Sequence, residues 1–592
     1  MKTKFAVSKS ILYVSLLAFI SFVVYILYIN QIVLYTANER SEFIVGEQFF
    51  NTLISKPFGL TQYVGAWLTQ FFYNPAVGSS VLLAIWVLIF FVGIKAFHLK
   101  GSAFALMLLP IACLLTSMVD LGYWIYIFRI KGYWFSHSVA YLAMLLLLWA
   151  ACSTPRKYHI VWYVIGFTLY PVLGWLALLF ILCLALSEKP TWREFVGLVL
   201  IFLAGYLWHI LLYSCLKSDD VMMAGMPRFV TPLDISDYHT IPFWCLGAVS
   251  LFMTLFSRFA NKSFVPLLCV CVSVVFTTSL MFKDKNYINE MRMVRSAEID
   301  NWKDVLELYS QTSSPTVTMV MLKNVALMNE GGLFDCSFKM GNNGTPINNP
   351  DSIHVSFLQI AAPVVYYNYG LINESFRLNF ECAVQNGFSP FRLKMLARCA
   401  KANGEKKLVE RYLVQLHGHP FYASWQPSSV TKKVQELQKC YADELTGIEN
   451  TGSYIVNSIS LWYESESKLA SEQALFYSMI RCDPQRFWTS IRKYVKLHME
   501  ETFPLHAQEA YILYMDKAPE QKRIMLPVEQ DVYERYKLFW DDLKEKAKPG
   551  VALKTMADGM RPKWGETYWF YYTFERKPYY MEKAKETNST IN

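Results

Sequence analysis

Ionisable side chains that could carry chemistry lie at the ends of long apolar segments. Three glutamates, Glu39, Glu42 and Glu47, follow the first apolar segment, and Asp120 closes the third. A positioned carboxylate can take a proton from a reacting hydroxyl. Ionisable groups near membrane depth are costly, and those that persist are candidates for function. Asp120, at the end of a span, is therefore a candidate for function.

Basic side chains and histidines lie in similar positions further along the chain, at or near the ends of later apolar segments. Such groups can hold a phosphate or relay a proton. For each of them a solvated charge at a loop end is the structural alternative. The candidate substrate-binding residues are Arg129, Lys131, His137, His209, Arg228 and His239.

Nine apolar segments precede Phe282, and none follows it. A helix needs roughly 20 apolar residues to cross a hydrocarbon core about 30 Å thick. The pair around Pro171 is short, so 158–187 forms either two brief crossings or one re-entrant hairpin. The predicted spans are residues 11–33, 78–97, 103–119, 134–152, 158–170, 171–187, 194–216, 241–257 and 264–282. We predict an all-α protein, with a polytopic transmembrane domain at 1–283 and a soluble helical domain at 284–592.

Lysines and arginines are concentrated in every second segment that connects two predicted spans. Lys2, Lys4 and Lys9 precede the first span, and later cations follow the same alternation: Lys95, Lys100, Arg156, Lys157, Lys189, Arg193, Arg258 and Lys262. The positive-inside tendency makes this side cytoplasmic. Nine crossings then place the C-terminal domain in the periplasm, and the protein in the inner membrane as a multi-pass protein. The net charge of +9 over 592 residues reflects this bias rather than nucleic-acid binding.

The first outer segment, 34–77, is the longest. It contains apolar residues at helical spacing with no charge between them: Leu60, Tyr63, Val64, Trp67, Leu68, Phe71 and Phe72. An uncharged amphipathic helix rich in aromatics suits the headgroup boundary of a bilayer. The alternative is a helix packed onto the protein's own outer domain.

Glycines punctuate the second half at a constant interval of 17 residues. Gly370, Gly387 and Gly404 each end a helical segment, where a left-handed cap position favours glycine. Helices of this length in pairs give a 34-residue period, which is the tetratricopeptide spacing. We predict a tetratricopeptide-like array of helical hairpins in this domain.

Nine aromatic side chains crowd into residues 564–580. They could form a surface for carbohydrate stacking or membrane docking. The structural alternative is a strap that fills the end of the helical array. Aromatic side chains bury a large area in either role, which favours the strap.

The order of these parts resembles the GT-C superfamily of membrane glycosyltransferases. The resemblance rests on a short cytoplasmic N-terminus, one span, a long outer segment with Glu39, Glu42 and Glu47, and a second outer acid, Asp120. It implies a polyprenyl-phosphate-linked sugar donor and a divalent cation such as Mg²⁺ or Mn²⁺. It also implies an outer acid acting as base or metal ligand, so the predicted catalytic residues are Glu39, Glu42, Glu47 and Asp120. The metal ligands themselves are unknown.

A second resemblance spans nearly the whole chain. Pro57-Phe58-Gly59-Leu60, Asn324-Val325-Ala326-Leu327 and Tyr568-Trp569-Phe570-Tyr571-Tyr572 look like segments of a Bacteroides-type family of multi-pass proteins of unknown function. That resemblance implies a Gram-negative setting and no particular reaction.

Two functions follow as expectations. The first is a GT-C-like transferase that acts at the periplasmic face on a polyprenyl-phosphate-linked sugar or a related lipid-linked donor. The second is a non-enzymatic assembly protein, anchored in the bilayer, whose helical repeats hold a periplasmic protein partner. Nine spans exceed what an anchor needs, which favours a task inside the membrane.

Overall fold

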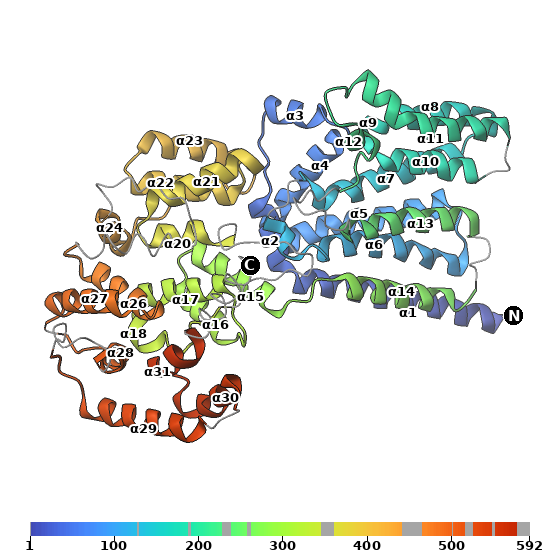
Figure 1. Cartoon of the computed structure of the whole chain (residues 1–592). Coiled ribbons are helices and arrows are strands. Elements are labelled where there is room, and N and C mark those ends of the chain that lie inside the picture. Colours follow the sequence, from blue (N-terminus) through green and yellow to red (C-terminus); the bar gives the residue numbers. More distant parts are fainter. Residues whose placement is uncertain are drawn as a thin grey trace, which may run out of the picture.

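The computed structural model describes residues 2–126, 130–187, 191–227, 238–256, 262–344, 360–440, 465–499, 501–515, 525–547 and 551–576. Every regular element in these ranges is a helix, which confirms the predicted all-α class. Figure 1 shows two bodies joined end to end. We call the first, from α1 to α14, the bundle, and the second, from α15 to η9, the helical domain.

Five stretches of the bundle are long and apolar enough to cross a membrane. They are α1 (Lys2–Ile29, apolar from Ser10), α5 (Pro75–Ala96), η2 with α6 (Gly101–Met107 and Leu108–Val119), α7 (Tyr133–Cys152) and α11 (Trp192–Leu211). Three shorter apolar helices accompany them: α10 (Trp175–Leu186), α13 (Ile241–Phe256) and α14 (Val265–Leu280). Each of the five coincides with a predicted span, and the remaining predicted spans coincide with shorter helices.

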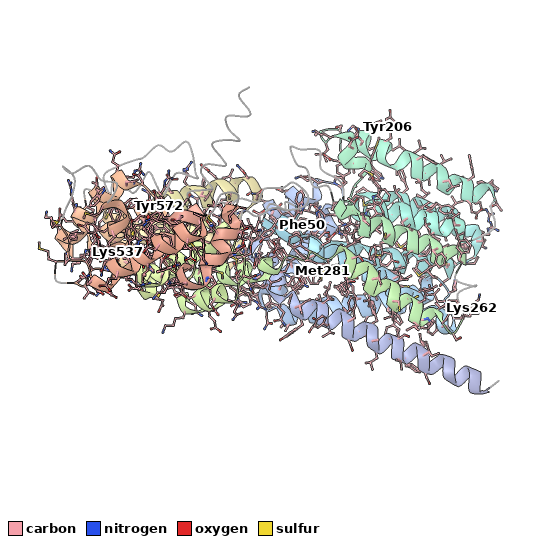
Figure 2. The ribbon with its side chains drawn as sticks, turned by 60° about the horizontal axis from the view of Figure 1, so that its bottom comes forward. Phe50, Tyr206, Lys262, Met281, Lys537 and Tyr572 are labelled. Carbon is pink, nitrogen blue, oxygen red and sulfur yellow. The ribbon has the colours of Figure 1, made fainter. Side chains whose placement is uncertain are left out.

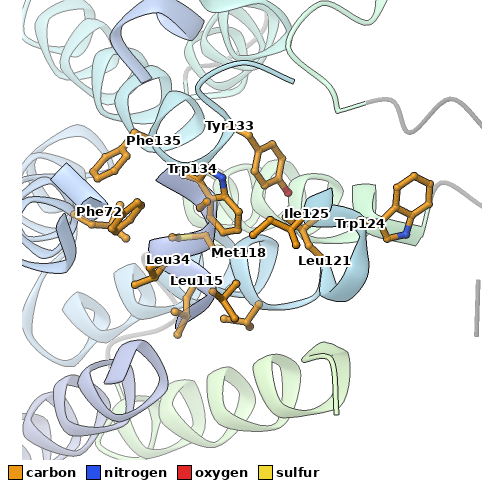
Figure 3. Close-up of a cluster of buried hydrophobic side chains, with 14 of the residues drawn as sticks. Leu34, Phe72, Leu115, Met118, Leu121, Trp124, Ile125, Tyr133, Trp134 and Phe135 are labelled. Carbon is orange, nitrogen blue, oxygen red and sulfur yellow. The ribbon is translucent and has the colours of Figure 1, made fainter. Parts of the chain in front are cut away.

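The helix α6 forms the centre of the bundle. In its span 89% of the residues are buried, against 22% in α11. It packs against both α13 and α14. Figure 3 shows part of this core, where Leu115 and Met118 of α6 gather with Trp134 of α7. Lipid is as apolar as a leucine side chain, so packing rather than hydrophobicity decides which span becomes central.

The segment around Pro171 folds into α8 (His159–Thr168), α9 (Tyr170–Leu173) and α10. The turn before α10 requires glycine, because Gly174 has a φ of 58° and a Cβ there would lie 2.1 Å from the carbonyl oxygen of Ala224. With ten and twelve residues, α8 and α10 have lengths of about 15 and 18 Å. Each is shorter than the hydrocarbon core.

The segment between α1 and α5 forms α2 (Gln31–Arg40), α3 (Glu47–Ile54), α4 (Gly59–Thr69) and η1 (Gln70–Tyr73). All four lie at the end of the bundle that faces the helical domain (Figure 1). This segment carries three of the four predicted catalytic acids, so its packing decides where they point.

The predicted amphipathic helix is α4, and its small residues face inward. Gly65 packs so closely on α7 that a Cβ there would lie 2.3 Å from the carbonyl oxygen of Gly132. Two large apolar side chains on the other face are exposed, Leu60 at 40% and Trp67 at 44%. At the following η1, the Phe71 ring meets Phe421 of the helical domain with centroids 5.5 Å apart. The exposed face fits the predicted boundary helix, whereas its far end packs on the helical domain.

The helical domain follows α14 and consists of short helices, most of which pack against their neighbours in sequence. They are α15 (Lys285–Glu298), α16 (Trp302–Ser310), α17 (Val317–Glu330), α18 (Leu333–Cys336), α20 (Ala362–Asn368), α21 (Ile372–Asn386), α22 (Pro390–Ala402), α23 (Lys406–His417), α24 (Lys432–Lys439), α26 (Lys468–Ile480), α27 (Pro484–Leu497), α28 (Leu505–Met515), α29 (Gln530–Lys546), α30 (Leu553–Trp564), α31 (Tyr568–Phe570) and η9 (Tyr571–Arg576).

The three evenly spaced glycines end helices as predicted. Gly370, Gly387 and Gly404 follow α20, α21 and α22, and their φ angles are 77°, 98° and 75°. Only glycine adopts this left-handed conformation without a steric cost. The sequence pattern therefore located three helix ends correctly.

The aromatic side chains of the tail are buried as far as residue 574 except Tyr572, which is half-buried, and Tyr579 and Tyr580 lie outside the described residues. Trp569 has no exposed surface, and its indole N–H donates to the carbonyl oxygen of Glu509 at 2.8 Å. Tyr568 and Tyr514 share a hydroxyl hydrogen bond of 2.7 Å. These contacts support the strap interpretation for this part of the tail.

Candidate functional site

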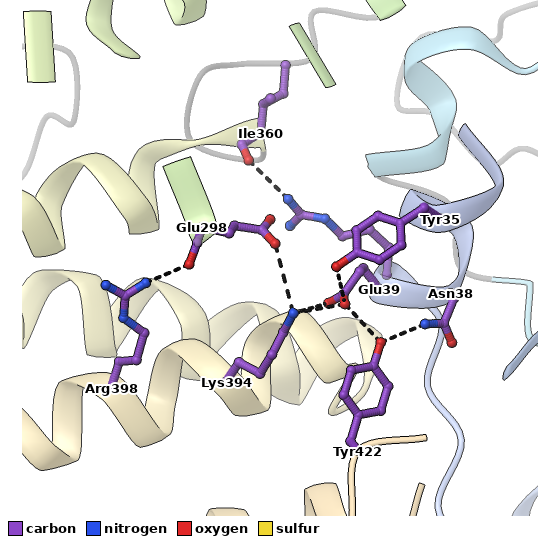
Figure 4. A network of polar contacts seen from close by, with 9 residues as sticks. Tyr35, Asn38, Glu39, Glu298, Ile360, Lys394, Arg398 and Tyr422 are labelled. Carbon is purple, nitrogen blue, oxygen red and sulfur yellow. Dashed lines mark hydrogen bonds and ion pairs between the residues drawn. The ribbon is translucent and has the colours of Figure 1, made fainter. Parts of the chain in front are cut away.

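Glu39 takes part in a buried ion pair that joins the bundle to the helical domain. It lies in the last turn of α2 and is 2% exposed. Lys394 of α22 places its Nζ 2.8 Å from each carboxylate oxygen of Glu39. The hydroxyls of Tyr35 and Tyr422 donate to the same carboxylate at 2.9 and 2.8 Å, and Asn38 donates to the Tyr422 hydroxyl (Figure 4).

One ammonium group at this junction faces two carboxylates. Burial opposes the charge of Glu39, but Lys394 and the hydroxyl donors lower its pKa below the usual value. Lys394 also lies 3.9 Å from a carboxylate oxygen of Glu298, at the end of α15. Burial raises the pKa of Glu298 to about 7, and the neighbouring charge of Glu39 contributes to the rise. Glu39 therefore carries the negative charge that balances Lys394.

Arg40, the next residue of α2, also crosses the junction. Its guanidinium donates to the carbonyl oxygen of Ile360 at 3.0 Å and lies 3.7 Å from the centre of the Phe391 ring. Planar cations stack well on aromatic faces. The end of α2 is thus held by charge, by hydrogen bonds and by ring contacts with the helical domain.

Glu42 and Lys131 form a second link across the junction. Lys131 lies 2.7 Å from Glu42 and donates to the carbonyl oxygen of Asn386 at 2.6 Å. The backbone N–H of Phe388 donates to Glu42 at 2.9 Å. Between these two residues, a Cβ on Gly387 would lie 2.2 Å from the Glu42 carboxylate. Burial lowers the pKa of Lys131, although Glu42 favours its charged form.

Glu47 and His209 lie apart from these contacts. Glu47 begins α3, where the positive end of the helix dipole suits an acid, and its side chain is exposed. His209, in the last turn of α11, has its Nε2 3.0 Å from the carbonyl oxygen of Leu216. A carbonyl only accepts hydrogen bonds, so this nitrogen is the donor.

Asp120 and His239 form a buried acid–imidazole pair. Asp120 caps the C-terminus of α6 and is 4% exposed, and His239 lies just before α13 and is 2% exposed. Nδ1 of His239 is 3.4 Å from Oδ2 of Asp120. The Trp124 ring stands edge-on to the imidazole with centroids 5.5 Å apart. The backbone N–H of Phe282 donates to Val119, which fixes the chain just before Asp120.

His137 lies one turn into α7 and is also buried. Its Nε2 lies 2.7 Å from the carbonyl oxygen of Gly225, and the carbonyl can only accept. Its ring packs on Phe243 of α13 with centroids 4.2 Å apart, and on Phe58. These contacts tie α7, α13 and the segment before α4 together around the imidazole.

Two predicted phosphate-binding residues, Arg129 and Arg228, lie outside the described residues. Within the described ranges, no group of three or more His, Cys, Asp or Glu side chains is arranged to hold a metal ion. Asp120 and His239 supply two potential ligands. The divalent cation stays a prediction, and we assign no step to it.

Sequence reasoning missed a further buried acid, Glu290 of α15. It has no exposed surface and receives hydrogen bonds from the hydroxyls of Thr316 and Tyr123, at 2.5 and 3.4 Å. Burial raises its pKa to about 7, against the effect of these donors. An acid in a polar, helix-patterned segment carries no sequence signal of burial, because its partners lie 26 and 167 residues away.

A protein-family model matches nearly the whole chain. The model of a family of unknown function, DUF6057, matches residues 7–575. Comparison with curated proteins and with solved structures finds no match. Because the match extends from the first span to the aromatic tail, the chain belongs to this family of unknown function, DUF6057.

Proposed function

We propose that the protein is a membrane-embedded transferase of the GT-C type, which uses Asp120 and His239 as its acid–base pair. The observation that carries the proposal is the burial of this pair, 3.4 Å apart, at the end of the bundle that faces the helical domain. A carboxylate that orients an imidazole is a recurring device for proton transfer. Ionisable groups inside a membrane bundle are functional candidates by default.

The reaction follows from this pair and a lipid-linked sugar. The oxygen of an acceptor hydroxyl forms a bond to the anomeric carbon of the sugar. The bond from that carbon to the lipid phosphate oxygen breaks, and the phosphate leaves with the bonding electrons. The hydroxyl proton passes to the imidazole of His239 when Nδ1–H donates to Asp120. Arg129 or Arg228 is assigned to hold the leaving phosphate.

Glu39 and Glu42, two acids of the first outer segment, are not the proton acceptors in this proposal. Glu39 is engaged by Lys394 and two hydroxyls, and Glu42 is engaged by Lys131 and a backbone N–H. Lys394 and the hydroxyl donors lower the pKa of Glu39 against the effect of burial, which makes Glu39 a weak base. Glu39 and Glu42 therefore link the bundle to the helical domain, and in this proposal their role is structural.

The orientation in the membrane is part of the proposal. Lys262, between α13 and α14, lies at the end of the bundle farthest from the helical domain, whereas Met281 lies near it (Figure 2). Cationic residues at the far end suit the cytoplasm. This supports a cytoplasmic N-terminus and a periplasmic helical domain, which nine crossings, or seven with a re-entrant hairpin at 158–187, would give.

The helical domain would then act as a cap over the acid–base pair. Consecutive helices that pack as hairpins, with glycines at a 17-residue interval, support a tetratricopeptide-like array. Such arrays commonly grip a peptide or protein partner. In this proposal the partner presents or receives the acceptor, so the assembly role accompanies the transferase role.

The test measures release of polyprenyl phosphate by the full-length protein in nanodiscs. A panel of synthetic polyprenyl-phosphate-linked monosaccharides is supplied with a membrane extract as the source of acceptor. Asp120→Asn should lower the release rate by roughly 10²–10⁴-fold, because the general base His239 loses the carboxylate that orients its imidazole. The matched control is Asp219→Asn, an exposed acid of α12 (Ser218–Met222). Equal rates in both variants would refute the assignment.

A further inference from the structure

The chain on either side of Asp120 is held by hydrogen bonds from the segment that joins the bundle to the helical domain. The backbone N–H of Phe282, just past the end of α14, donates to the carbonyl oxygen of Val119 at 3.0 Å. The hydroxyl of Tyr287, in the first turn of α15, donates to the carbonyl oxygen of Gly122 at 2.8 Å. Asp120 therefore lies between two carbonyl groups whose donors both come from this joining segment.

The turn that follows Asp120 is tightly packed against the same segment. Tyr287 is buried, and its ring stands edge-on to the rings of Tyr123 and Phe282, with centroids 5.0 Å apart in both pairs. Gly122 has a φ of 53°, and a Cβ there would lie 2.4 Å from the Phe282 ring. The turn is therefore fixed by close packing and by the hydrogen bond to its first carbonyl.

The same turn carries the ring that faces the imidazole. It forms η3 (Gly122–Tyr126), in which Trp124 stands edge-on to His239 with centroids 5.5 Å apart. Asp120, two residues before η3, places its Oδ2 3.4 Å from Nδ1 of His239. A shift of the turn would therefore disturb both side chains that contact the imidazole.

We infer that Tyr287 is a positioning residue, whose hydroxyl holds the Gly122 carbonyl and thereby keeps Asp120 against His239. The inference rests on the proposed function for the reaction, but the geometry of the pair is observable without it. A misplacement of about 1 Å in a catalytic group can cost about 10²-fold in rate. A purely structural Tyr287 would instead support stability and leave the geometry of the pair unchanged when its hydroxyl is removed.

The first test observes the imidazole by nuclear magnetic resonance, in the full-length protein in nanodiscs with isotope-labelled histidine. The resonance of the Nδ1–H proton of His239 is identified by its absence from His239→Gln. It should move in Asp120→Asn, which lacks the accepting carboxylate. Tyr287→Phe keeps the aromatic ring and removes only the hydroxyl, and it should move the resonance in the same direction as Asp120→Asn.

A second variant and a matched control accompany Tyr287→Phe. Gly122→Ala drives a Cβ into the Phe282 ring and should also move the resonance, because it displaces the same turn. The control is Tyr309→Phe, in which the hydroxyl that is lost donates to the carbonyl oxygen of Gly341 at 3.0 Å within the helical domain. Tyr309 is buried like Tyr287, so the control removes an equivalent hydrogen bond and should leave the resonance in place.

The second test measures release of polyprenyl phosphate at increasing donor concentration. Tyr287→Phe should lower the maximal rate per folded molecule about tenfold and leave the half-saturating concentration unchanged, because its hydroxyl acts on the pair and not on the donor. A resonance that stays where it is in Tyr309→Phe overturns the inference, and so does an unchanged maximal rate when Asp120→Asn slows release. If the resonance moves in Tyr287→Phe but Asp120→Asn does not slow release, Tyr287 positions the pair and the proposed reaction is wrong.

Discussion

Lys394 lies 2.8 Å from Glu39 although 355 residues separate them in the chain. The pair is buried where α22 of the helical domain meets α2 of the bundle. A buried charge is tolerated only with a close partner and further hydrogen bonds, and Tyr35 and Tyr422 supply these. The contact fixes how the helical domain sits on the bundle.

Removal of Lys394 should destabilise the junction strongly. Lys394→Met leaves the Glu39 carboxylate buried without its cation, a change that typically costs about 3–5 kcal/mol. Chemical denaturation followed by tryptophan fluorescence measures the change. The control is Lys468→Met, because Lys468 and its partner Glu501 are 58% and 48% exposed and such pairs contribute about 1 kcal/mol or less.

A compensating substitution tests the same pair from the other side. Combining Lys394→Met with Glu39→Gln removes both charges and should recover a large part of the stability lost by Lys394→Met alone. If the double variant is less stable than the single one by the full cost of a second deletion, the two residues do not act as a pair.

Replacement of Gly387 should weaken the link between Glu42 and Lys131. An alanine at this position takes on a left-handed conformation and displaces the Glu42 carboxylate, whose oxygen lies 2.2 Å from the added Cβ. Gly404→Ala is a matched control, because Gly404 has a φ of 75° but no atom within 4 Å of a Cβ. The control should lose about 1–2 kcal/mol from backbone strain alone.

Gly387→Ala should lose about a further 1–3 kcal/mol, the cost of leaving buried polar groups without partners. The midpoint of chemical denaturation reports both variants under the same conditions. Equal losses in the two variants would mean that the Glu42 link contributes nothing measurable to stability.

The free energy of unfolding should decrease as pH rises, because Glu290 is buried in its protonated form. Its pKa is raised to about 7 by burial, with Asp284 adding to the rise and the hydroxyls of Thr316 and Tyr123 opposing it. The folded state therefore holds a proton that the unfolded state releases above about pH 4.5. This contribution is complete below about pH 4.5 and is lost as pH rises through about 7.

Glu290→Gln keeps the neutral form at every pH. Its stability relative to the unchanged protein should therefore improve between about pH 5 and about pH 8, as measured by the shift in melting temperature. Glu307→Gln, on an exposed position of α16, is the control and should show no such trend. A relative stability of Glu290→Gln that is independent of pH would contradict the buried-acid assignment.

The aromatic tail should act as part of the core. Trp569→Ala removes a side chain with no exposed surface, and such changes cost about 3–5 kcal/mol. Met525→Ala, at a residue that is 89% exposed, should change stability by no more than about 0.5 kcal/mol. A Trp569→Ala protein with unchanged stability and impaired binding to membranes would instead favour the docking interpretation.

Local signals in the sequence predicted local features correctly. The caps at Gly370, Gly387 and Gly404 depend on a conformation that glycine adopts in any surroundings. The helix at α4 was predictable from the spacing of its apolar residues. The central position of α6 was not, because every span is similarly apolar and only packing distinguishes them.

The candidate site was predictable only in part. Asp120 and His239 are recognisable as ionisable residues near the end of a span, but their proximity depends on the packing of α6 against α13. The partners of Glu39 could not be predicted, because Lys394 and Tyr422 belong to polar helices in which most charges face water. The sequence therefore pointed to the acids of the first outer segment as strongly as to Asp120.

The rate of polyprenyl phosphate release, measured for Asp120→Asn and Glu39→Gln and normalised to folded protein, tests the central claim most directly. The account predicts that Asp120→Asn loses roughly 10²-fold or more, whereas Glu39→Gln retains the rate of the unchanged protein per folded molecule. The opposite pattern, with Glu39→Gln inactive and Asp120→Asn active, would contradict the account and return the catalytic role to the first outer segment.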